Sequence, residues 1–448
     1  MILPVSPQTR RVFHLSLPIF AELLLQLLVG NMDQFMISHF GPAAVASIGN
    51  GNQVMNVVII VLETMSSATT ILLTQYIGAG KEGESCNRIA TVGVAISAVF
   101  SLLMGLALLC APHVIFTLLR TPEESFAGAC LYTRIVGGTV LLQGLYIEFC
   151  AVLRSYTLLK EVVAVSVVMN LLNVCGNAVL INGYLGFPQL GVAGAAVSTC
   201  VSKAVGLGLA VWMLRRKCSV RFRGSCLRPF PAETCRRLLA IAMPSGTESL
   251  SYNVSQIFIL RFINLMGTTV IATKVYGSML ANVAYVYSIA AAQATQILIG
   301  YLLGARKLEE VSCRVWSTVR IALAVSEFLT LVIFLFCDPI YSVFTADPAI
   351  HALGRQILLV EFFLEVGRSV NIVMTRGLTT AGDVWYPVTV GIFSMWTVAV
   401  LGGWLLGHYF GLGLVGIWIA MACDESVRGL LFVLRFRRGS WRRRRLVD

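Results

Sequence analysis

The second half of this 448-residue chain repeats the first. At an offset of 226 residues, with no gap, Pro18 matches Pro244, Glu22 matches Glu248 and Gly41 matches Gly267. Later in each half the best offset is 222, and there Arg154 matches Arg376. A repeat of this length constrains the fold to two copies of one structural unit.

The composition is that of a membrane protein. Hydrophobic residues make up 57% of the chain, charged residues only 12%, and the mean hydropathy is +0.80, so there is too little charge to cover a soluble surface of this size. Apolar runs of about 20 residues, long enough to cross the hydrocarbon core, occur six times in each half. They lie at 15–39, 47–75, 90–111, 128–153, 162–183, 191–213, 239–264, 272–303, 316–337, 355–375, 384–408 and 413–434.

An even number of spans gives both copies the same orientation in the membrane. We therefore expect an all-α membrane protein of twelve transmembrane helices in two pseudo-symmetric six-helix bundles, related by an axis along the membrane normal. Duplicated halves are typical of secondary transporters, in which the substrate site lies between the copies.

Basic residues gather on one side of the predicted spans. The central loop from Arg215 to Arg237 carries eight Lys and Arg, the tail from Arg435 to Arg445 carries seven, and the opposite loops hold only Arg120 and Arg355. This asymmetry predicts that both termini are cytoplasmic. A basic tail also suits nucleic acid, but next to a span it is better explained as an orientation signal that contacts anionic lipid. The expected partner is thus the lipid bilayer and not nucleic acid.

Nothing in the sequence indicates an enzyme or a resident cofactor. The 12 cysteines are scattered without metal-type spacing, the five histidines are isolated, and there is no nucleotide-binding or hydrolase motif. We expect no metal site and no enzymatic activity. Uphill transport would then depend on a coupling ion, H⁺ or Na⁺.

Ionisable side chains within spans are costly unless they are paired or hydrated, so they mark the candidate sites. In the first span Glu22, Gln26 and Asp33 share one helical face. Asp33 has no basic residue within a turn of its own helix, which makes it the strongest candidate for a proton or cation carrier unless Lys203 reaches it. The fifth and sixth spans add polar residues: Asn170, Asn173, Asn177 and Lys203.

The second half carries more ionisable residues. They are Glu248 with Tyr252 in the seventh span, Glu361, Glu365 and Arg368 on one face of the tenth, and Asp424, Glu425 and Arg428 in the twelfth. A structural explanation stands beside the functional one, because each arginine can neutralise acids on its own helix face. The asparagines can likewise tie helices together, and the equivalence of Lys203 and Glu425 in the repeat suggests a scaffold role in each half.

The chain resembles the multidrug and toxic compound extrusion (MATE) family over essentially its whole length, and bacterial members most. The similarity lies in Pro18 to Gly41, QYIGAGK at 75–81, YLLGARK at 301–307, GVAGAA at 191–196 and RGLTTAGD at 376–383. It implies a V-shaped pair of six-helix lobes that exchange small organic, often cationic, compounds for H⁺ or Na⁺ by alternating access. We expect an N-lobe at 1–214, a basic linker at 215–238 and a C-lobe at 239–448, in a monomer of the bacterial inner membrane.

The resemblance also implies roles for single residues. Asp33 occupies the acid of the family's first helix and Asn173 the asparagine of its fifth, while Asn177 stands where many prokaryotic members have Asp. These three form the expected cation-coupling site. Glu365 precedes Arg376 by eleven residues, where some members have a functional Asp, and Tyr252 stands at the acid of helix 7, one turn after Glu248. The expected substrate or secondary cation site comprises Gln26, Glu22, Tyr252, Glu248, Glu365, Arg368 and Lys203.

Two other functions remain as alternatives. A flippase or exporter of lipid-linked or other metabolites shares such helical lobes, but it typically has more than twelve spans and a cationic cavity. A membrane-embedded enzyme is the other, and the absence of a His-rich, Ser/Lys or two-acid metal motif disfavours it.

Overall fold

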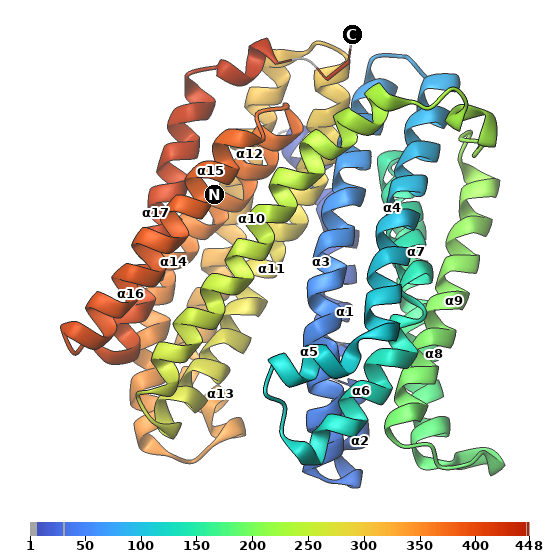
Figure 1. The fold of residues 1–448 in the computed structure, drawn as a ribbon. Coiled ribbons are helices and arrows are strands. Elements are labelled where there is room, and N and C mark those ends of the chain that lie inside the picture. Colours follow the sequence, from blue (N-terminus) through green and yellow to red (C-terminus); the bar gives the residue numbers. More distant parts are fainter. Residues whose placement is uncertain (1–6, 30–31, 445, 448) are drawn as a thin grey trace. The chain divides into compact units, whose positions relative to one another are not determined.

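The computed structural model describes residues 7–29, 32–444 and 446–447, and over these residues it contains helices and no strand (Figure 1). Every span expected from the sequence coincides with a helix or a run of adjoining helices. The physical reason is general: in lipid each backbone N–H and C=O must be paired within its own segment, and only the helix does this for a single span.

In the first half α1 and α2 make up the described part of the first predicted span, and the fourth span is divided. α6 and α7 together form that span and are bent by 51° at the residues between them. The helices are α1 (Pro7–Val29), α2 (Met32–Ile37), α3 (Pro42–Gly78), α4 (Glu84–Cys110), α5 (Pro112–Leu118), α6 (Glu123–Gly137), α7 (Val140–Ser155), α8 (Leu159–Asn182) and α9 (Val192–Lys217).

The second half repeats this order. They are α10 (Ala232–Asn264), α11 (Thr268–Gly304), α12 (Leu308–Leu335), α13 (Cys337–Phe344), α14 (Pro348–Thr380), α15 (Trp385–Ser394), α16 (Gly402–Trp404) and α17 (Gly413–Arg437). Wider π-helical turns at Met395–Leu401 and Leu405–Tyr409 join α15 and α16 into one helical run that ends at Tyr409.

Seven helices of the described chain are long and apolar enough to cross a membrane, or eight if α6 and α7 count as one span. Those that fall short of this test include α14 and α17, which hold the ionisable groups of the tenth and twelfth predicted spans. Each of these two helices carries three closely spaced charged residues, which are the residues that mark the candidate sites.

The chain forms two compact units, and both divisions fall inside a helix. One unit comprises the chain up to Phe20 and Thr247–Asp448, and the other comprises Ala21–Gly246. The divisions are equivalent in the repeat, because Phe20 matches Gly246 at the offset of 226. The halves thus exchange the first part of α1 for the first part of α10. Lobe boundaries drawn in chain order, 1–214 and 239–448, stay a prediction.

Side-chain contacts account for this exchange. In the early part of α1, Ser16 lies 3.3 Å from the Tyr287 hydroxyl and the Phe20 ring packs edge-on against the Tyr287 ring at 5.6 Å. In the early part of α10, Arg237 donates a hydrogen bond of 3.1 Å to the Tyr76 hydroxyl. Each contact lies within one unit.

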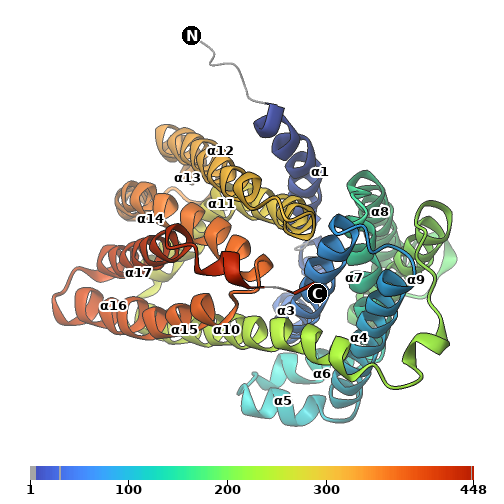
Figure 2. The same ribbon diagram turned by 90° about the horizontal axis from the view of Figure 1, so that it is seen from above.

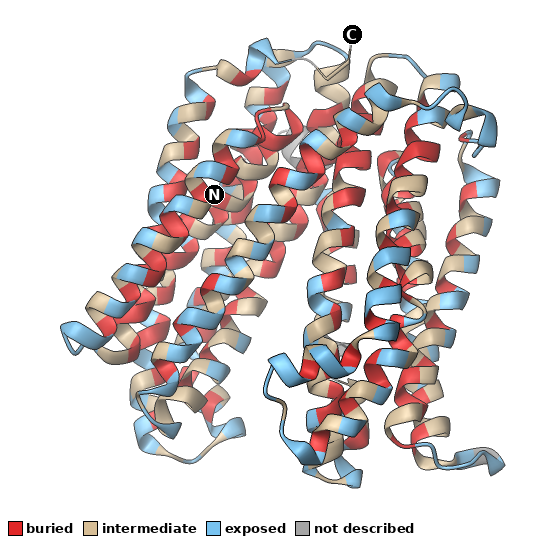
Figure 3. Ribbon diagram, in the orientation of Figure 1, coloured by how far each residue is buried: buried red, intermediate tan, exposed pale blue. Residues whose placement is uncertain are grey.

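Each unit has a helix that organises its packing. In the unit formed by Ala21–Gly246, α3 packs against α4, α6 and α7, and α8 pairs with α9 (Figure 2). In the other unit α14 packs against α11, α12 and α17. Buried residues line the facing sides of these helices (Figure 3). The equivalent helices α3 and α11 are the most buried of the apolar spans, at 61% and 67% of their windows.

Candidate functional site

A polar site in the first half surrounds Asp33. The short helix α2 packs against α3, α8 and α9, and this contact places the Asp33 carboxyl on the buried Asn177. The Asn177 amide donates a hydrogen bond of 2.5 Å to Asp33 Oδ1 and lies 3.5 Å from Asn173 Oδ1. Asn173 in turn donates to Thr199 Oγ1 at 3.2 Å. The three residues expected to form the coupling site are therefore together, with a hydroxyl of α9 beside them.

Close packing of α8 on α9 positions this group. A side chain added at Gly176 would begin 2.4 Å from Ser198 Oγ, so only glycine allows α9 to approach so near. Ser198 uses that proximity to donate a hydrogen bond of 2.9 Å to the Asn173 carbonyl. The two asparagines are thereby fixed on the face of α8 that meets α2 and α9.

Lys203 acts on this site through its charge and not through contact. It lies one turn after Thr199 on α9, and its charge interacts with that of Asp33. No ion pair of 4 Å or less joins it to an acid among the described residues. The carboxylate of Asp33 is instead surrounded by amide and hydroxyl groups. These are hard oxygen ligands and hydrogen-bonding partners, which suit a proton or a hard monovalent cation.

Glu22 belongs to a different network from Asp33, although both were expected on one face of one helix. Glu22 is buried on α1 and forms an ion pair of 2.7 Å with Arg154 of α7. Arg154 also interacts with the charge of Glu63 on α3. Gln26, one turn after Glu22, is exposed. Glu22 is thus neutralised by a partner, whereas Asp33 is not.

In the second half Arg368 holds two acids of its own helix, as their spacing predicted. Its guanidinium lies 2.8 Å from Glu361 and 3.1 Å from Glu365, and it covers the face of the Tyr285 ring at 4.7 Å. Both carboxyls are also hydrogen-bonded: Trp418 Nε1 donates to Glu361 at 2.8 Å, and Ser369 donates to Glu365 at 3.1 Å.

A second arginine pairs with the acids of α17. Arg428 lies 2.6 Å from Asp424 and 2.9 Å from Glu425. Asn371 of α14 donates to Glu425 at 2.6 Å, and Ser394 of α15 donates to Asp424 at 2.6 Å. The polar groups of α14, α15 and α17 therefore form a cluster of two bonded sets, one around Arg368 and one around the buried Arg428, and the charge of Arg368 also interacts with that of Glu425.

Glu248 lies beside this cluster without bonding to it. Among the described residues it forms no hydrogen bond or ion pair, and the charges of Arg428 and Arg376 act on it from a distance. Gly391 makes room for it, because an added side chain would begin 2.7 Å from Glu248 Oε1. Tyr252, one turn later on α10, is 42% exposed.

Two buried acids were not identified from the sequence. Glu148 of α7 is fully buried and accepts a hydrogen bond of 2.9 Å from Ser97. Asp383, between α14 and α15, is held by Arg435 at 2.8 Å and Arg444 at 3.3 Å. The rule that acids inside spans are costly would have identified Glu148, which lies within the fourth predicted span.

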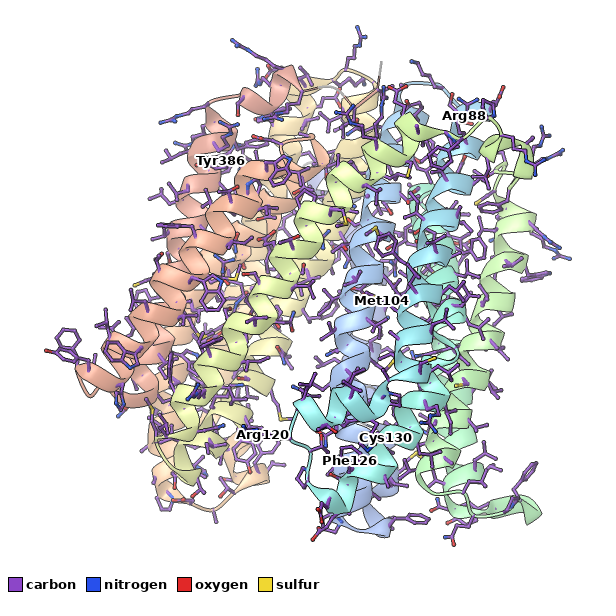
Figure 4. The ribbon with its side chains drawn as sticks, in the orientation of Figure 1. Arg88, Met104, Arg120, Phe126, Cys130 and Tyr386 are labelled. Carbon is purple, nitrogen blue, oxygen red and sulfur yellow. The ribbon has the colours of Figure 1, made fainter. Side chains whose placement is uncertain are left out.

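The residues labelled in Figure 4 lie at the ends and in the middle of the helix bundles. Tyr386, labelled in Figure 4, lies under the Arg435 guanidinium at 4.7 Å, where the basic tail returns to the bundle. In the other unit Figure 4 places Arg88 at one end of the bundle, Met104 at mid-height and Arg120 toward the opposite end. α4 therefore runs through the bundle, with Met104 in its apolar middle.

Comparison with known proteins agrees with the repeat. A family model described as MatE matches residues 18–179 and again residues 244–405. An uncharacterized transporter of Bacillus subtilis, YisQ, is 32% identical over 97% of this chain and 96% of its own length. A probable multidrug resistance protein of Thermotoga maritima, NorM, is 26% identical over 98% and 95%.

Solved structures show the same fold. A MATE structure in the bent conformation superimposes with a TM-score of 0.89 at 21% identity, covering 97% of this chain and 96% of that chain. A MOP superfamily transporter from Pyrococcus furiosus gives 0.89 at 21% identity over 98% of both chains. The arrangement of twelve helices in two lobes fits these structures. The chain therefore belongs to the MatE family and is a membrane transporter of that family.

Proposed function

We propose that this transporter exports small organic, often cationic, compounds in exchange for H⁺ or Na⁺, and that Asp33 is its coupling group. The observation that carries this proposal is the environment of Asp33. Its carboxyl is held by the amide of Asn177, and among the described residues no cation pairs with it directly. Several relatives that bear the name probable multidrug resistance protein support the substrate class.

The site supplies what exchange requires. A proton, or Na⁺ held by Asp33 with the amide oxygens of Asn173 and Asn177, neutralises the carboxylate. An organic cation is attracted to that same negative charge, so the ion and the substrate compete for it. Binding of the ion therefore opposes binding of the substrate at this site. As the protein alternates between two conformations, a gradient of one can then drive the other across the membrane.

The acids of the second half suit this role less well. Glu361 and Glu365 share Arg368, and Asp424 and Glu425 share Arg428. Each guanidinium already forms ion pairs with its two carboxylates, so an ion that neutralised either acid would have to disrupt an existing pair. Glu248, which bonds to neither arginine, is the remaining candidate for a second ion site, and Tyr252 lies near it.

We also propose the orientation in which both termini and the basic loop after α9 face the cytoplasm of a bacterial cell. The basic residues at the end of α9, Arg215 and Arg216, match Arg437 and Arg438 at the end of α17 in the repeat. Both helices therefore end on the same side of the membrane, and positive-inside asymmetry assigns that side.

Transport in vesicles tests the coupling role. Asp33→Asn keeps the shape of the side chain and removes its charge, so an imposed pH or Na⁺ gradient should no longer drive efflux of a fluorescent organic cation. Binding of that cation should persist and should lose its pH or Na⁺ dependence, because linkage requires a group whose occupancy differs between the two states.

Glu365→Gln is the matched control, since it converts another buried carboxyl to an amide. It should retain gradient-driven efflux. Efflux at the wild-type rate by the Asp33→Asn protein would overturn the assignment, and the acids of α10 and α14 would become the candidates.

A further inference from the structure

Glu148 lies where three helices of the first half meet, apart from the Asp33 site. α7 packs against both α3 and α4 there, and no part of the Glu148 side chain is exposed. α4 presents small residues at every fourth position along this contact: Gly93, Ser97, Ser101 and Gly105. Small residues allow membrane helices to approach closely, so the carboxyl is enclosed by backbone and side chains on all sides.

Among the described residues, hydroxyl groups alone reach this carboxyl. Ser97 Oγ of α4 donates to Glu148 Oε2 at 2.9 Å, and the Thr69 hydroxyl of α3 is its other polar neighbour. A side chain added at Gly93 would begin 2.5 Å from Thr69 Oγ1 and 2.5 Å from Glu148 Oε1, so both oxygens converge on one point. Oε1 accepts no hydrogen bond of ordinary geometry from the described residues, although the Thr69 hydroxyl lies close enough to interact with the carboxyl.

The charged groups on the surrounding helices have other partners. Arg154, on the same helix, pairs with Glu22 and interacts with Glu63 of α3, while Arg88 of α4 pairs with Glu84. On α8 and α9, Glu161 pairs with Lys217, and the charge of Lys203 acts on Asp33. Within the described chain, no cation faces Glu148.

An ionised carboxylate in this position would be a fully buried charge without a counter-ion, which is among the costliest arrangements in a protein. A proton removes that charge. It also gives Oε1 a hydrogen to donate, and the Thr69 hydroxyl is the oxygen beside it. A proton on Oε1 therefore explains both why this oxygen accepts no ordinary hydrogen bond and why no cation lies near the carboxyl.

We propose that Glu148 is a second proton-binding site of this transporter, occupied by a proton in the conformation seen here, and that the neutral carboxylic acid holds α3, α4 and α7 together. The second half has no counterpart. At the offset of 222 Glu148 matches Val370, and Thr295, which matches Thr69 at 226, bonds instead to Thr318 at 2.6 Å. The site does not depend on the coupling role of Asp33.

Infrared spectroscopy of the purified protein in lipid tests the proposal, because a protonated carboxyl has a C=O stretching band that a carboxylate lacks. Glu148→Gln should remove one such band at neutral pH, and Asp33→Asn should leave that band in place. If Glu148→Gln folds and removes no protonated-carboxyl band, the proposal is wrong. It is equally wrong if the band appears only when Na⁺ is withdrawn, since the site would then bind Na⁺.

Ser97→Ala gives a second measurement that does not require Glu148 to be replaced. It removes the hydrogen bond to the carbonyl oxygen, so the same band should move to higher frequency; an unmoved band would contradict the geometry.

Discussion

The two halves descend from one repeat but treat buried charge in different ways. In the first half Asp33 is held by neutral amides and Lys203 acts on it only from a distance. In the second half four carboxylates share two arginines, two acids to each arginine. A group without a fixed counter-ion gains neutrality when it binds an ion, whereas neutralising a group paired with an arginine breaks an existing ion pair. Under the proposed function, the first half therefore carries the ion exchange, and the arginine-paired acids of the second half stabilise the structure.

One pair of equivalent positions illustrates the difference between the two halves. Glu22 and Arg154 form an ion pair of 2.7 Å. Their counterparts Glu248 and Arg376 do not, because Arg376 donates to Gln296 at 3.3 Å while the charge of Arg428 acts most strongly on Glu248. Equivalence in a repeat thus predicts where a side chain lies but not which partner it takes.

The largest effect on stability is expected from Arg428→Met. The change leaves Asp424 and Glu425 buried without a cation, and removing one partner of a buried pair costs about 3–5 kcal/mol. Reversible unfolding in mixed micelles measures it. Additional replacement of both acids by their amides should restore most of the loss, because it is the uncompensated charge that destabilises. A loss below about 1 kcal/mol would show that the cluster is not the structural element of the second half.

A smaller loss is expected from Arg154→Met in the first half. This change strands one close acid, Glu22, and the Arg154 side chain is 24% exposed, so water can reach part of the site. We expect about 2–3 kcal/mol in the same unfolding assay. The double variant with Glu22→Gln should be closer to the wild type than Arg154→Met alone. Equal destabilisation by Arg154→Met and Arg428→Met would remove the contrast between the halves.

Glu365→Gln tests the contrast between the two halves by measuring transport. Its effect on the free energy of unfolding should be smaller than those of the two arginine variants. Arg368 keeps Glu361 at 2.8 Å, and an amide at 365 still accepts from Ser369, so about 1 kcal/mol of stability should be lost. Efflux assays with several organic cations should show altered relative rates while gradient-driven transport continues. Complete loss of coupling at normal protein levels would transfer the coupling role to the second half.

The sequence predicted where the helices and the ionisable side chains lie better than it predicted which residues they contact. The repeat and the apolar runs predicted every span, and the helical spacing of Glu361, Glu365 and Arg368 predicted their pairing. The exchange of the first parts of α1 and α10 was not predictable, because it depends on contacts such as Ser16 with Tyr287, which are 271 residues apart. The bond between Asp33 and Asn177 likewise joins residues 144 apart, and only the resemblance to a family suggested it.

The smallest effects are expected at the basic ends of the two halves. Lys217 pairs with Glu161 at 2.5 Å, and Arg442 of the tail pairs with Glu309 at 2.8 Å. Glu161 is only 16% exposed, whereas Glu309 is 82% exposed, so water and salt screen the second pair more fully. Lys217→Met should cost up to about 1 kcal/mol and Arg442→Met at most about 0.5 kcal/mol. Raising the salt concentration should diminish both values, since Lys217, Arg442 and Glu309 are exposed to solvent, while the cost of Arg428→Met should stay nearly constant. If salt weakens the Arg428 variant's penalty as much as that of the end pairs, the cluster of α14 and α17 is hydrated, and its acids would then be as free to exchange ions as Asp33.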